Sequence, residues 1–377
     1  MQAFTEPPRD GFTVSEVESL IRDHPSLQVG SGLELIDRDL NLLEDISDDM
    51  TGGAVERSSF ADLHGSFACG LSRELDWGNS IVRPYYTMSD GIITMRFNLG
   101  AYIATSPKLT IEQEPDVQDL VGYDVLHFLS DRAGEVYVVE AGTAYLVAVE
   151  EILTAMGYTK YIIDQQAATS TLTDARVWAL DENIKWINIV NDLLAAIGYR
   201  GVYSDWNGYL RCEPYIVPVD RMNEWIYTSE GGAAMVAPRR EVDRDFFEAP
   251  NRWVAVRSNE VDGVPPVEGN GIYTLVNEFE GPTSVTARNG RAVTRYLSFE
   301  AVDQAALVSQ TDAAADEDKT LSTKLTVSTA PNPLHWHFDR VLLVDPKINY
   351  GEPLDCQVTK WTLPFDGSNM GHEWTAI

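Results

Sequence analysis

Residues 181–217 read DENIKWINIVNDLLAAIGYRGVYSDWNGYLRCEPYIV, and this stretch decides the fold of the middle of the chain. Asp181 is a suitable N-cap residue for a helix, and Gly198 is a suitable residue to end it. Between them, apolar residues recur at steps of three and four positions: Ile184, Ile187, Val190, Leu194 and Ile197. This spacing places them on one face and predicts an amphipathic helix.

A hairpin is predicted directly after this helix. Val202-Tyr203 and Tyr209-Leu210 flank Trp206-Asn207-Gly208, and the Asn-Gly dipeptide favours a tight type I′ turn. Pro214 and Pro218 close the unit. We interpret the helix and the hairpin as a structural module, because the segment contains no set of side chains that performs chemistry.

An earlier segment has a similar pattern. Residues 141–157 predict a helix that Ala141-Gly142-Thr143 caps at its N-terminus and that ends at Gly157. It ends in the letters AMGY, as the later helix ends in AIGY. Duplication explains this similarity, and chance also explains it, because the shared motif is short. In either case the residues between 121 and 220 are predicted to form an α/β domain.

Alternating apolar and polar residues predict strands on both sides of this domain. Residues 93–99 alternate in this way, and Asp90-Gly91 precedes them as a turn. Further strands are predicted at residues 252–257, 272–279, 340–344 and 355–363. A chain of 377 residues is long enough for two or three domains. The predicted fold class is α+β, with a β-barrel-like domain at 1–120, an α/β domain at 121–220 and a second β-barrel-like domain at 221–377.

Two segments have less regular patterns. Residues 45–58 are polar and contain glycine, so we expect an exposed loop there. Asp48-Asp49 within it lacks the alternating oxygen ligands and the closing glutamate of a calcium loop. Residues 297–311 look helical, and residues 303–318 are rich in alanine and aspartate. We expect a helix there that shelters one end of a barrel.

The charge of the chain is strongly negative. It carries 58 acidic and 28 basic residues, for a formal net charge of -30. Such a chain does not bind the DNA backbone by counterion release. Three explanations remain open: a host with high internal salt, a surface that lets nucleic acid pass without holding it, and an ordinary acidic protein of a high-GC organism.

The sequence gives no indication of a membrane span, a signal peptide or a disulfide framework. No run of eighteen apolar residues predicts a membrane span. The first residues, MQAFTEPPRDGF, lack the basic start and apolar core of a signal peptide. Cys69, Cys212 and Cys356 lie far apart, so we expect free thiols rather than a disulfide framework or a zinc site.

Candidate catalytic patterns are incomplete. His335-Trp336-His337 would place two imidazoles on one face of a strand, but Asp339 is the sole near neighbour as a third zinc ligand, so we expect a surface histidine pair. Gly269-Asn270-Gly271 lacks the third glycine and the helix of a phosphate loop, and no Gly-x-Ser-x-Gly elbow occurs. Carboxylate pairs for glycoside cleavage are too numerous to assign. We therefore predict no catalytic, cofactor-binding or metal-binding residue, no cofactor and no enzymatic activity.

The order of these regions resembles the baseplate hub, or tail-tip hub, proteins of tailed phages and tailed viruses. Residues 121–126 (VGYDVL) resemble the strand-to-helix entry into the family's middle domain. The helices that end at Gly157 and Gly198, with the strand-turn-strand that follows, resemble that domain itself. Residues 249–256 (APNRWVAV) are similar to the strand that opens the family's second barrel. The resemblance spans nearly the whole chain.

The resemblance implies a defined role in the virion. In such hubs two similar barrels per chain form a ring, and three chains adapt a sixfold tail tube to a threefold tip. The implied partners of the homotrimer are the tail tube or distal tail ring, the tape measure protein, and tail fibre or tip proteins. DNA would pass transiently during genome ejection, and a negative channel would repel its phosphate backbone. A halophilic host, such as that of a haloarchaeal tailed virus, fits the composition, and an actinobacterial phage is the alternative.

Two other functional classes remain open. A cell-wall or polysaccharide hydrolase would show a cleft that holds a carboxylate with a raised pKa. A carbohydrate-binding tail module would show a row of exposed aromatic residues, and the chain has nine tryptophans and sixteen tyrosines. A hub would instead bury large flat interfaces around a threefold axis. The chain has no room for a lysozyme-like or fibre domain, so we expect partner chains to supply those activities.

Overall fold

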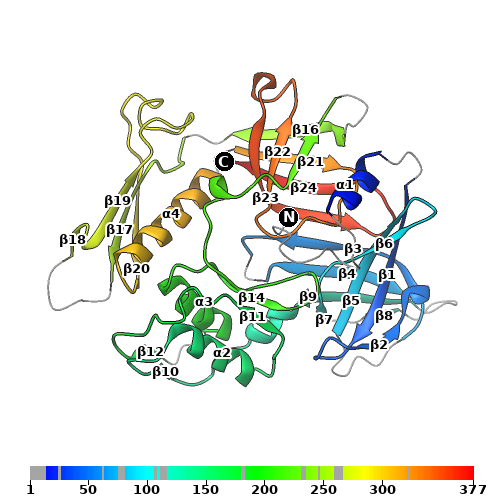
Figure 1. The fold of residues 1–377 in the computed structure, drawn as a ribbon, viewed down its shortest axis with the longest axis horizontal. Coiled ribbons are helices and arrows are strands. Elements are labelled where there is room, and N and C mark those ends of the chain that lie inside the picture. Colours follow the sequence, from blue (N-terminus) through cyan, green and yellow to red (C-terminus); the bar gives the residue numbers. More distant parts are fainter. Residues whose placement is uncertain are drawn as a thin grey trace.

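The structure is a computed structural model that describes residues 14–23, 27–61, 63–74, 81–105, 108–110, 117–179, 183–230, 235–244, 247–258, 266–320 and 323–377. It is mostly β-sheet with few helices (Figure 1). A large sheet fills one side of the molecule, and two smaller units lie beside it. Among the described residues, no helix has the length and the apolar character needed to cross a membrane.

The N-terminal strands make up one half of the large sheet. They run in the order β2-β1-β5-β7-β9-β4-β3, and the helix α1 (Val14–Asp23) buries Val17 and Leu20 in their core. The strands are β1 (Gln28–Ile36), β2 (Leu42–Asp45), β3 (Met50–Ser58), β4 (Gly65–Leu71), β5 (Ile81–Ser89), β6 (Thr94–Asn98), β7 (Tyr102–Ala104), β8 (Lys108–Thr110) and β9 (Val117–Asp124). The predicted strand at 93–99 and the turn before it are confirmed, because β5 and β6 pair as a hairpin.

The C-terminal strands make up the other half. They run in the order β16-β21-β24-β23-β22-β15, in which β15 and β22 are parallel and the other neighbours antiparallel. The strands are β15 (Trp225–Thr228), β16 (Val236–Arg244), β21 (Thr323–Thr329), β22 (Arg340–Val344), β23 (Leu354–Pro364) and β24 (Met370–Ala376), with the short helix η5 (Asn349–Gly351) before β23. The predicted strands at 340–344 and 355–363 are confirmed.

The long strand β23 joins the two halves into one sheet. Its first residues pair with β22, and its last residues pair with β3, from Lys360 opposite Ser58 to Pro364 opposite Ala54. One hydrophobic cluster also contains residues of both halves, among them Phe67 and Trp361. Strands assigned by sequence to the first and the third domain therefore share a sheet and a core. The three domain boundaries themselves stay a prediction.

The two faces of this joined sheet differ. Residues that point inward are large and buried, as Phe67, Trp361 and Trp374 are. Residues that point outward on β9, β4, β3, β23, β24 and β21 are exposed or half-buried, and most of them are small. We call this outward side the uncovered sheet face; it consists of Val121, Tyr123, Ser66, Ala68, Ala54, Glu56, Lys360, Thr362, Gly371, Glu373, Thr326 and Ser328.

The middle of the chain forms a helical unit with its own core. The helices α2 (Tyr145–Ala155) and α3 (Trp186–Ala196) pack together and bury Val149, Val190 and Leu194. Short elements surround them: η3 (Val125–Leu129), β10 (Tyr137–Val139), β11 (Tyr161–Ile163), β12 (Arg176–Trp178), β13 (Tyr203–Ser204), β14 (Leu210–Cys212) and η4 (Pro218–Asp220). The predicted α/β character of this region is present in these elements.

The two helices repeat the same local structure. At the end of α2 the backbone N–H of Tyr158 donates to the carbonyl of Leu153, and at the end of α3 that of Tyr199 donates to the carbonyl of Leu194, 41 residues further on. Tyr137 on β10 and Trp178 on β12 have the same separation and pair directly with each other. The repeat therefore extends beyond the shared four-residue motif, which favours duplication over chance.

The helix predicted to follow Asp181 begins a few residues later. Its first residue is Trp186, because the side chain of Asn188 accepts the backbone N–H of Lys185 and fixes the N-terminal turn there. The predicted N-cap, Asp181, lies outside the described residues. Gly198 ends the helix as predicted, with a positive φ of 74°. The earlier helix also ends at its predicted glycine, but no side chain caps its N-terminus, so the expected cap at Thr143 is wrong.

The predicted hairpin exists, but its turn is not type I′. Strands β13 and β14 pair antiparallel across residues 205–209. The Asp205 carboxylate accepts the backbone N–H groups of Asn207 and Tyr209, both at 2.9 Å. Of the Asn-Gly pair, Gly208 alone has a positive φ, at 95°, whereas type I′ requires two such residues. The aspartate side chain therefore shapes this loop.

The prediction of an exposed loop at residues 45–58 is wrong. After the short helix η2 (Ser47–Asp49), these residues form β3, which lies between β4 and β23. Gly52 and Gly53 have φ values of 133° and 142° and accompany a shift in register against β4. Glycine and polar residues gave the segment a loop-like composition, although its later part buries Val55 and Arg57 at alternate positions.

Residues 252–320 form the second small unit. Its sheet runs in the order β18-β19-β17-β20, from β17 (Arg252–Arg257), β18 (Val267–Glu268), β19 (Gly271–Val276) and β20 (Thr294–Phe299). The helix α4 (Gln304–Thr320) packs on one face of it (Figure 1). Residues 297–299 are strand rather than helix, because they pair with β17 and Leu297 packs against the cluster around Leu307. The helix at 303–318 is confirmed, but it covers this sheet and not the end of a barrel.

Candidate functional site

A buried ion pair lies where the first half of the large sheet meets the helical unit. Arg57 on β3 and Asp124 at the end of β9 are 3.3 Å apart, and their side chains are 1% and 0% exposed. The same guanidinium group donates to the hydroxyl of Ser204 on β13 at 3.2 Å and to the carbonyl of Leu99 at 3.3 Å. We call Arg57, Asp124, Ser204 and their direct partners the buried polar junction.

Neighbouring aromatic rings complete this junction. The Arg57 guanidinium lies over the Trp336 ring at 4.2 Å and over the Tyr102 ring at 5.3 Å. Trp336 also donates its indole N–H to the carbonyl of Ser204 at 3.1 Å. Three parts of the chain therefore meet at one buried cation, which is an arrangement that fixes their relative positions.

Asp124 has a raised pKa, as a catalytic acid would need, but its carboxylate is not accessible to a substrate. Burial raises its pKa to about 6, and the Arg57 guanidinium opposes this rise. Its side chain has no exposed surface, and it accepts the backbone N–H of Leu126 at 3.2 Å. A substrate cannot reach the carboxylate, so we assign it a role in holding the junction.

The expectation of a surface histidine pair at residues 335–337 is wrong. His335 and His337 are 1% and 3% exposed and lie in the connection between β21 and β22, not on a strand. The Asp339 carboxylate accepts the backbone N–H of Trp336 at 2.8 Å, and Phe338 has a positive φ of 59°, so the chain turns here. This turn directs the two imidazoles into different surroundings.

Each histidine has its own set of partners. His335 contacts Asp339 through Nδ1 at 2.9 Å and the hydroxyl of Tyr227 through Nε2 at 2.5 Å. His337 lies 3.3 Å from Arg57 Nη1 through its Nε2, and its ring is tilted against that of His64, with ring centroids 4.7 Å apart. Burial lowers the pKa of both imidazoles well below the usual value, so they are neutral at pH 7. They are structural residues of the core.

Candidate metal ligands do not gather in the part of the chain that the structure describes. No group of three or more His, Cys, Asp or Glu residues there is arranged to hold a metal ion. Asp49 instead pairs with Arg73 at 2.7 Å, and Arg73 also contacts Glu44 at 2.6 Å. Cys69, Cys212 and Cys356 are free and buried, as expected from their spacing.

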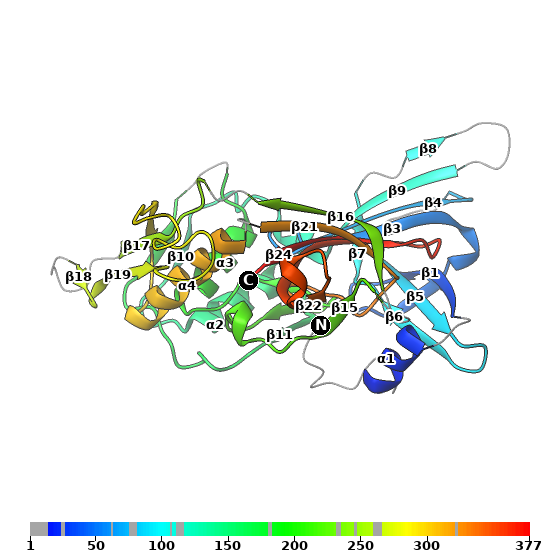
Figure 2. The ribbon, with the colours of Figure 1, turned by 90° about the horizontal axis from the view of Figure 1, so that it is seen from above.

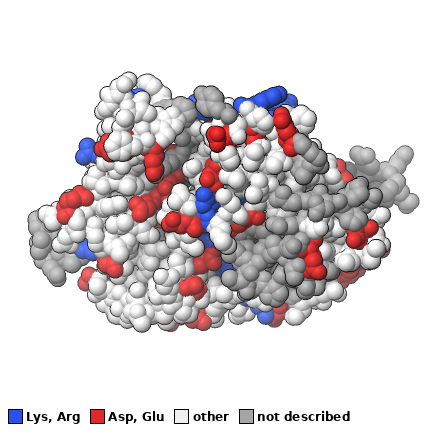
Figure 3. All heavy atoms as spheres, turned by 45° about the horizontal axis from the view of Figure 1, so that its top comes forward, with Lys and Arg blue, Asp and Glu red and all other residues white. Residues whose placement is uncertain are grey.

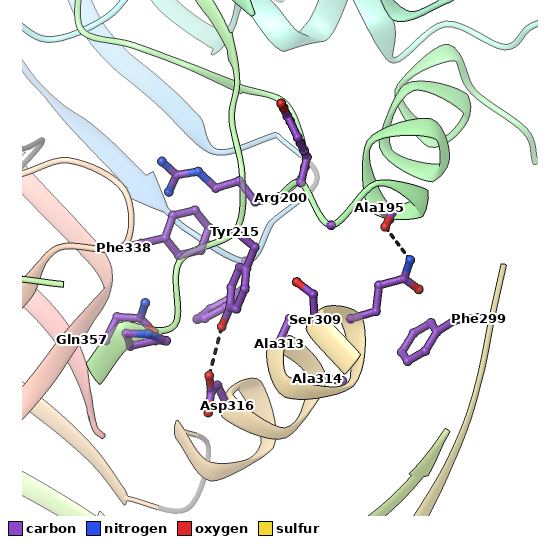
Figure 4. Close-up of a pocket in the computed structure, with 16 residues that line it drawn as sticks. Ala195, Arg200, Tyr215, Phe299, Ser309, Ala313, Ala314, Asp316, Phe338 and Gln357 are labelled. Atoms are coloured by element: carbon purple, nitrogen blue, oxygen red, sulfur yellow. Dashed lines mark hydrogen bonds between the residues drawn. The ribbon is translucent and has the colours of Figure 1, made fainter. Parts of the chain in front are cut away.

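An open cavity lies at the joint between the helical unit, α4 and β23 (Figure 4). Its volume is about 330 Å³, and aromatic side chains such as Tyr215 and Phe338 line it together with Arg200. Tyr215 donates its hydroxyl to Asp316 at 3.2 Å across the joint. Among the described lining residues Asp316 is the sole carboxylate, so the cavity lacks the carboxylate pair of a glycoside hydrolase.

The sequence analysis assigned no role to the residues of the buried polar junction. Arg57 fell in the segment predicted as a loop, and Asp124 appeared only as part of the VGYDVL motif. The one available signal was the alternation of Val55 and Arg57, which places an arginine on the buried side of a strand. The prediction that no residue is catalytic or binds a cofactor or metal stays a prediction.

Comparisons with known proteins identify the fold. No protein-family model matches the chain, and no curated protein sequence matches it. The tail protein from Neisseria meningitidis MC58 superposes with a TM-score of 0.63 at 11% identity, over 92% of this chain and 96% of that chain. The 43 kDa tail protein of prophage MuSo2 from Shewanella oneidensis gives 0.60 at 10% identity, over 92% and 98%. The prophage tail protein gp18 from Listeria monocytogenes EGD-e gives 0.51 at 11% identity, over 91% and 94%.

These matches cover nearly the full length of both chains, although sequence identity is close to the level of unrelated proteins. They therefore show a shared fold and do not by themselves transfer a function. They confirm the resemblance that the order of regions in the sequence indicated. The chain has the fold of phage and prophage tail proteins.

Proposed function

We propose that this chain is a structural component of a virus tail, in which three copies form a hub ring at the baseplate or tail tip. The ring would continue the channel of the tail tube, adapt its sixfold symmetry to a threefold tip and let the genome leave. The full-length match to tail proteins supports a location in the virion tail.

The uncovered sheet face is the observation that carries this proposal. It runs without interruption across both halves of the large sheet, because β3 and β23 pair directly. Its central residues are small, as Ala54, Ala68 and Gly371 are, and the outward Glu56 and Lys360 neutralise each other at 3.0 Å. A wall of this kind offers few side chains that would hold a passing polymer.

The charge of the molecule fits the passage of DNA. Acidic side chains are spread over the face drawn in Figure 3, and basic ones are less widespread there. With a net charge of -30, the chain repels a phosphate backbone and gains nothing from counterion release. The DNA would therefore move past the ring without being bound.

The proposed partners follow from this position in the tail. They are two further copies of the chain, the tail tube or distal tail ring on one side, and tail fibre or tip proteins on the other. The tape measure protein and then DNA would pass through the channel. A halophilic host remains our hypothesis for the acidic composition.

The alternatives have less support. The carbohydrate-binding hypothesis relied on aromatic residues, but Trp225, Trp253, Trp336, Trp361 and Trp374 are all fully buried core residues. The hydrolase hypothesis required an accessible carboxylate of raised pKa, and Asp124 and Asp205, whose pKa values burial raises, are 0% and 1% exposed.

Electron microscopy of the purified chain tests the proposal. We expect class averages of a ring with threefold symmetry and a central channel, collected at molar salt, where repulsion between acidic copies is screened. The same images at low salt serve as the matched comparison. Compact monomers or twofold dimers at both salt concentrations would contradict the hub.

A further inference from the structure

The connection between β19 and β20 is long and belongs to the outermost part of the molecule. Residues 277–293 link the two strands through bends and turns, without a helix or a strand of their own. Figure 1 and Figure 2 show the sheet of β17, β18 and β19 at the opposite end of the molecule from β1, β5 and β6. Connections of this length are uncommon in compact domains and often serve a function. We call residues 277–293 the outer loop.

A buried asparagine holds the base of the outer loop. Asn251, directly before β17, has no exposed surface. Its side-chain amide donates to the carbonyls of Thr283 and Arg291, both at 3.0 Å, and accepts the backbone N–H of Val293 at 2.7 Å. Because a buried amide that loses such partners is costly, these bonds fix the backbone at three points. The outer loop therefore has a defined shape.

A second asparagine fixes the first turn of the outer loop. The side-chain amide of Asn277 donates to the carbonyl of Glu280 and accepts the backbone N–H of the same residue, both at 2.9 Å. The backbone N–H of Thr286 also donates to the carbonyl of Glu278, at 3.1 Å. The backbone on both sides of Phe279 is therefore held by bonds that do not involve the Phe279 side chain.

Phe279 stands exposed between two acidic residues. It is 81% exposed, and Glu278 and Glu280 are exposed as well. The ring belongs to none of the hydrophobic clusters that the described residues form. Burial of a phenylalanine ring is strongly favourable, and the chain does not use this free energy for its own folding. It is available for contact with another molecule.

The order of the outer loop makes it suited to recognition. A segment that is already fixed in shape loses little conformational freedom when it binds, so more of the contact free energy appears as affinity. Aromatic residues are enriched in the buried centres of protein interfaces, where a few side chains carry most of the binding free energy. Phe279 has the exposure and the fixed backbone of such an anchor.

The charges beside Phe279 indicate what kind of molecule it contacts. Exposed glutamates are repelled by the phosphates of nucleic acid and by anionic lipid head groups. They also disfavour a second copy of the chain, whose net charge is -30. A protein surface with lysine and arginine side chains around an apolar pocket complements both the ring and the two carboxylates.

We infer that the outer loop docks onto a different protein, in which an apolar pocket takes the Phe279 ring and basic side chains around the pocket face Glu278 and Glu280. The inference goes beyond the proposed hub and does not depend on the threefold ring. It assigns a contact surface to the end of the molecule that lies opposite β1, β5 and β6.

Urea unfolding of the purified chain tests whether the ring is free for a partner. Phe279→Leu is expected to leave the midpoint unchanged, because the ring is exposed. Phe67→Leu, at a core position that is 1% exposed, is the matched comparison and is expected to lower the midpoint. Equal losses in the two variants would show that Phe279 is a structural residue and would overturn the inference.

Photo-cross-linking in the host cells that make the chain identifies the contact. The full chain with Phe279→p-benzoyl-phenylalanine is expected to give one main product with a different protein. The attached segment of that protein should carry more lysine and arginine than aspartate and glutamate. Ile92→p-benzoyl-phenylalanine, at a position that is 91% exposed in the turn between β5 and β6, is the control and should not give this product.

Three results of this experiment would overturn the inference. They are a main product with a second copy of the chain, the same product from both positions, and the absence of any protein product from position 279. An attached segment in which acidic residues predominate would also contradict it, because Glu278 and Glu280 would then face like charges.

Charge reversal gives an independent readout. Glu278→Lys with Glu280→Lys, combined with the cross-linker at position 279, is expected to lower the yield of the product about tenfold, because like charges then face each other. Glu150→Lys with Glu151→Lys makes the same change of charge at exposed positions on α2 and should leave the yield unchanged. Equal yields from the two double variants would contradict the basic rim.

The outcome is separable from that of the proposed hub. Threefold rings of a chain that gives no product at position 279 would overturn the docking and leave the hub intact. A chain that never forms a ring, yet cross-links at position 279 to a basic segment of another protein, would support the docking and contradict the hub.

Discussion

Arg57→Met is expected to lower the free energy of unfolding by about 3–5 kcal/mol, because it leaves the buried Asp124 carboxylate without its cation. Methionine keeps much of the apolar stem of arginine, so the loss reports the charge rather than the volume. Urea unfolding at pH 7 of the variant and the wild type measures the difference.

Two further variants make this prediction specific. Arg73→Met removes a pair of contacts to Glu44 and Asp49 at a position that is 40% exposed, and we expect a much smaller loss of stability than from Arg57→Met, because solvent screens exposed ion pairs. Adding Asp124→Leu to Arg57→Met is expected to restore part of the lost stability, because neither charge is then left unpaired. Equal effects of Arg57→Met and Arg73→Met would contradict a special role for the buried polar junction.

His372→Gln is expected to make the stability of the protein less sensitive to acid. His372 is 3% exposed, its Nε2 lies 2.8 Å from the hydroxyl of Thr329, and burial lowers its pKa to about 3. In the unfolded chain the pKa of histidine is about 6.5. Between these two values the unfolded chain binds a proton that the folded protein does not, so acid favours unfolding.

The sign and the size of this effect follow from proton linkage. Above about pH 6.5 the imidazole is neutral in both states and does not affect the balance. Below that pH, His372 costs about 1.4 kcal/mol of stability for each pH unit, until the pH approaches 3. Glutamine does not titrate, so between pH 6 and pH 4 the stability of the variant should fall less steeply by this amount.

Urea unfolding at several pH values from 7 to 4 tests the histidine prediction. Asp124 acts in the opposite direction, because its raised pKa makes the folded state bind a proton first, but it is present in both proteins and cancels in the comparison. Parallel curves for the wild type and His372→Gln would show that His372 is protonated in the folded state.

The periodicity of apolar residues correctly predicted the helices and strands that bury one face and expose the other. The helix that buries Val190 and Leu194 and the strand that buries Trp253 and Ala255 have one apolar side, and both lie where the sequence placed them. Glycines also marked ends correctly, because Gly157 and Gly198 have the positive φ that other residues avoid. These features depend on neighbours in the sequence.

The predictions that were wrong concern segments whose structure is set by contacts between residues far apart in the sequence. The strand β3 was missed because its central place comes from pairing with β4 and with β23, some 300 residues away. Its glycines permit the register shift but read locally as a loop. His335 and His337 alternate as strand residues would, yet Asp339 turns the chain and buries each imidazole separately.

The buried polar junction was not predictable for the same reason. Arg57, Asp124 and Ser204 come from three separate segments and meet only in the folded chain. A single sequence with so many carboxylates gives no means of choosing the partner of one arginine. The resemblance to tail hub proteins, by contrast, came from the order of regions over the whole chain, and the shared fold confirms it.

The mass of the protein in solution tests the central claim of a threefold ring most directly. Light scattering at low salt and at molar salt should give three times the chain mass of 41.9 kDa at molar salt, and less where repulsion between chains of net charge -30 is unscreened. A mass of one or two chains under both conditions would contradict the account.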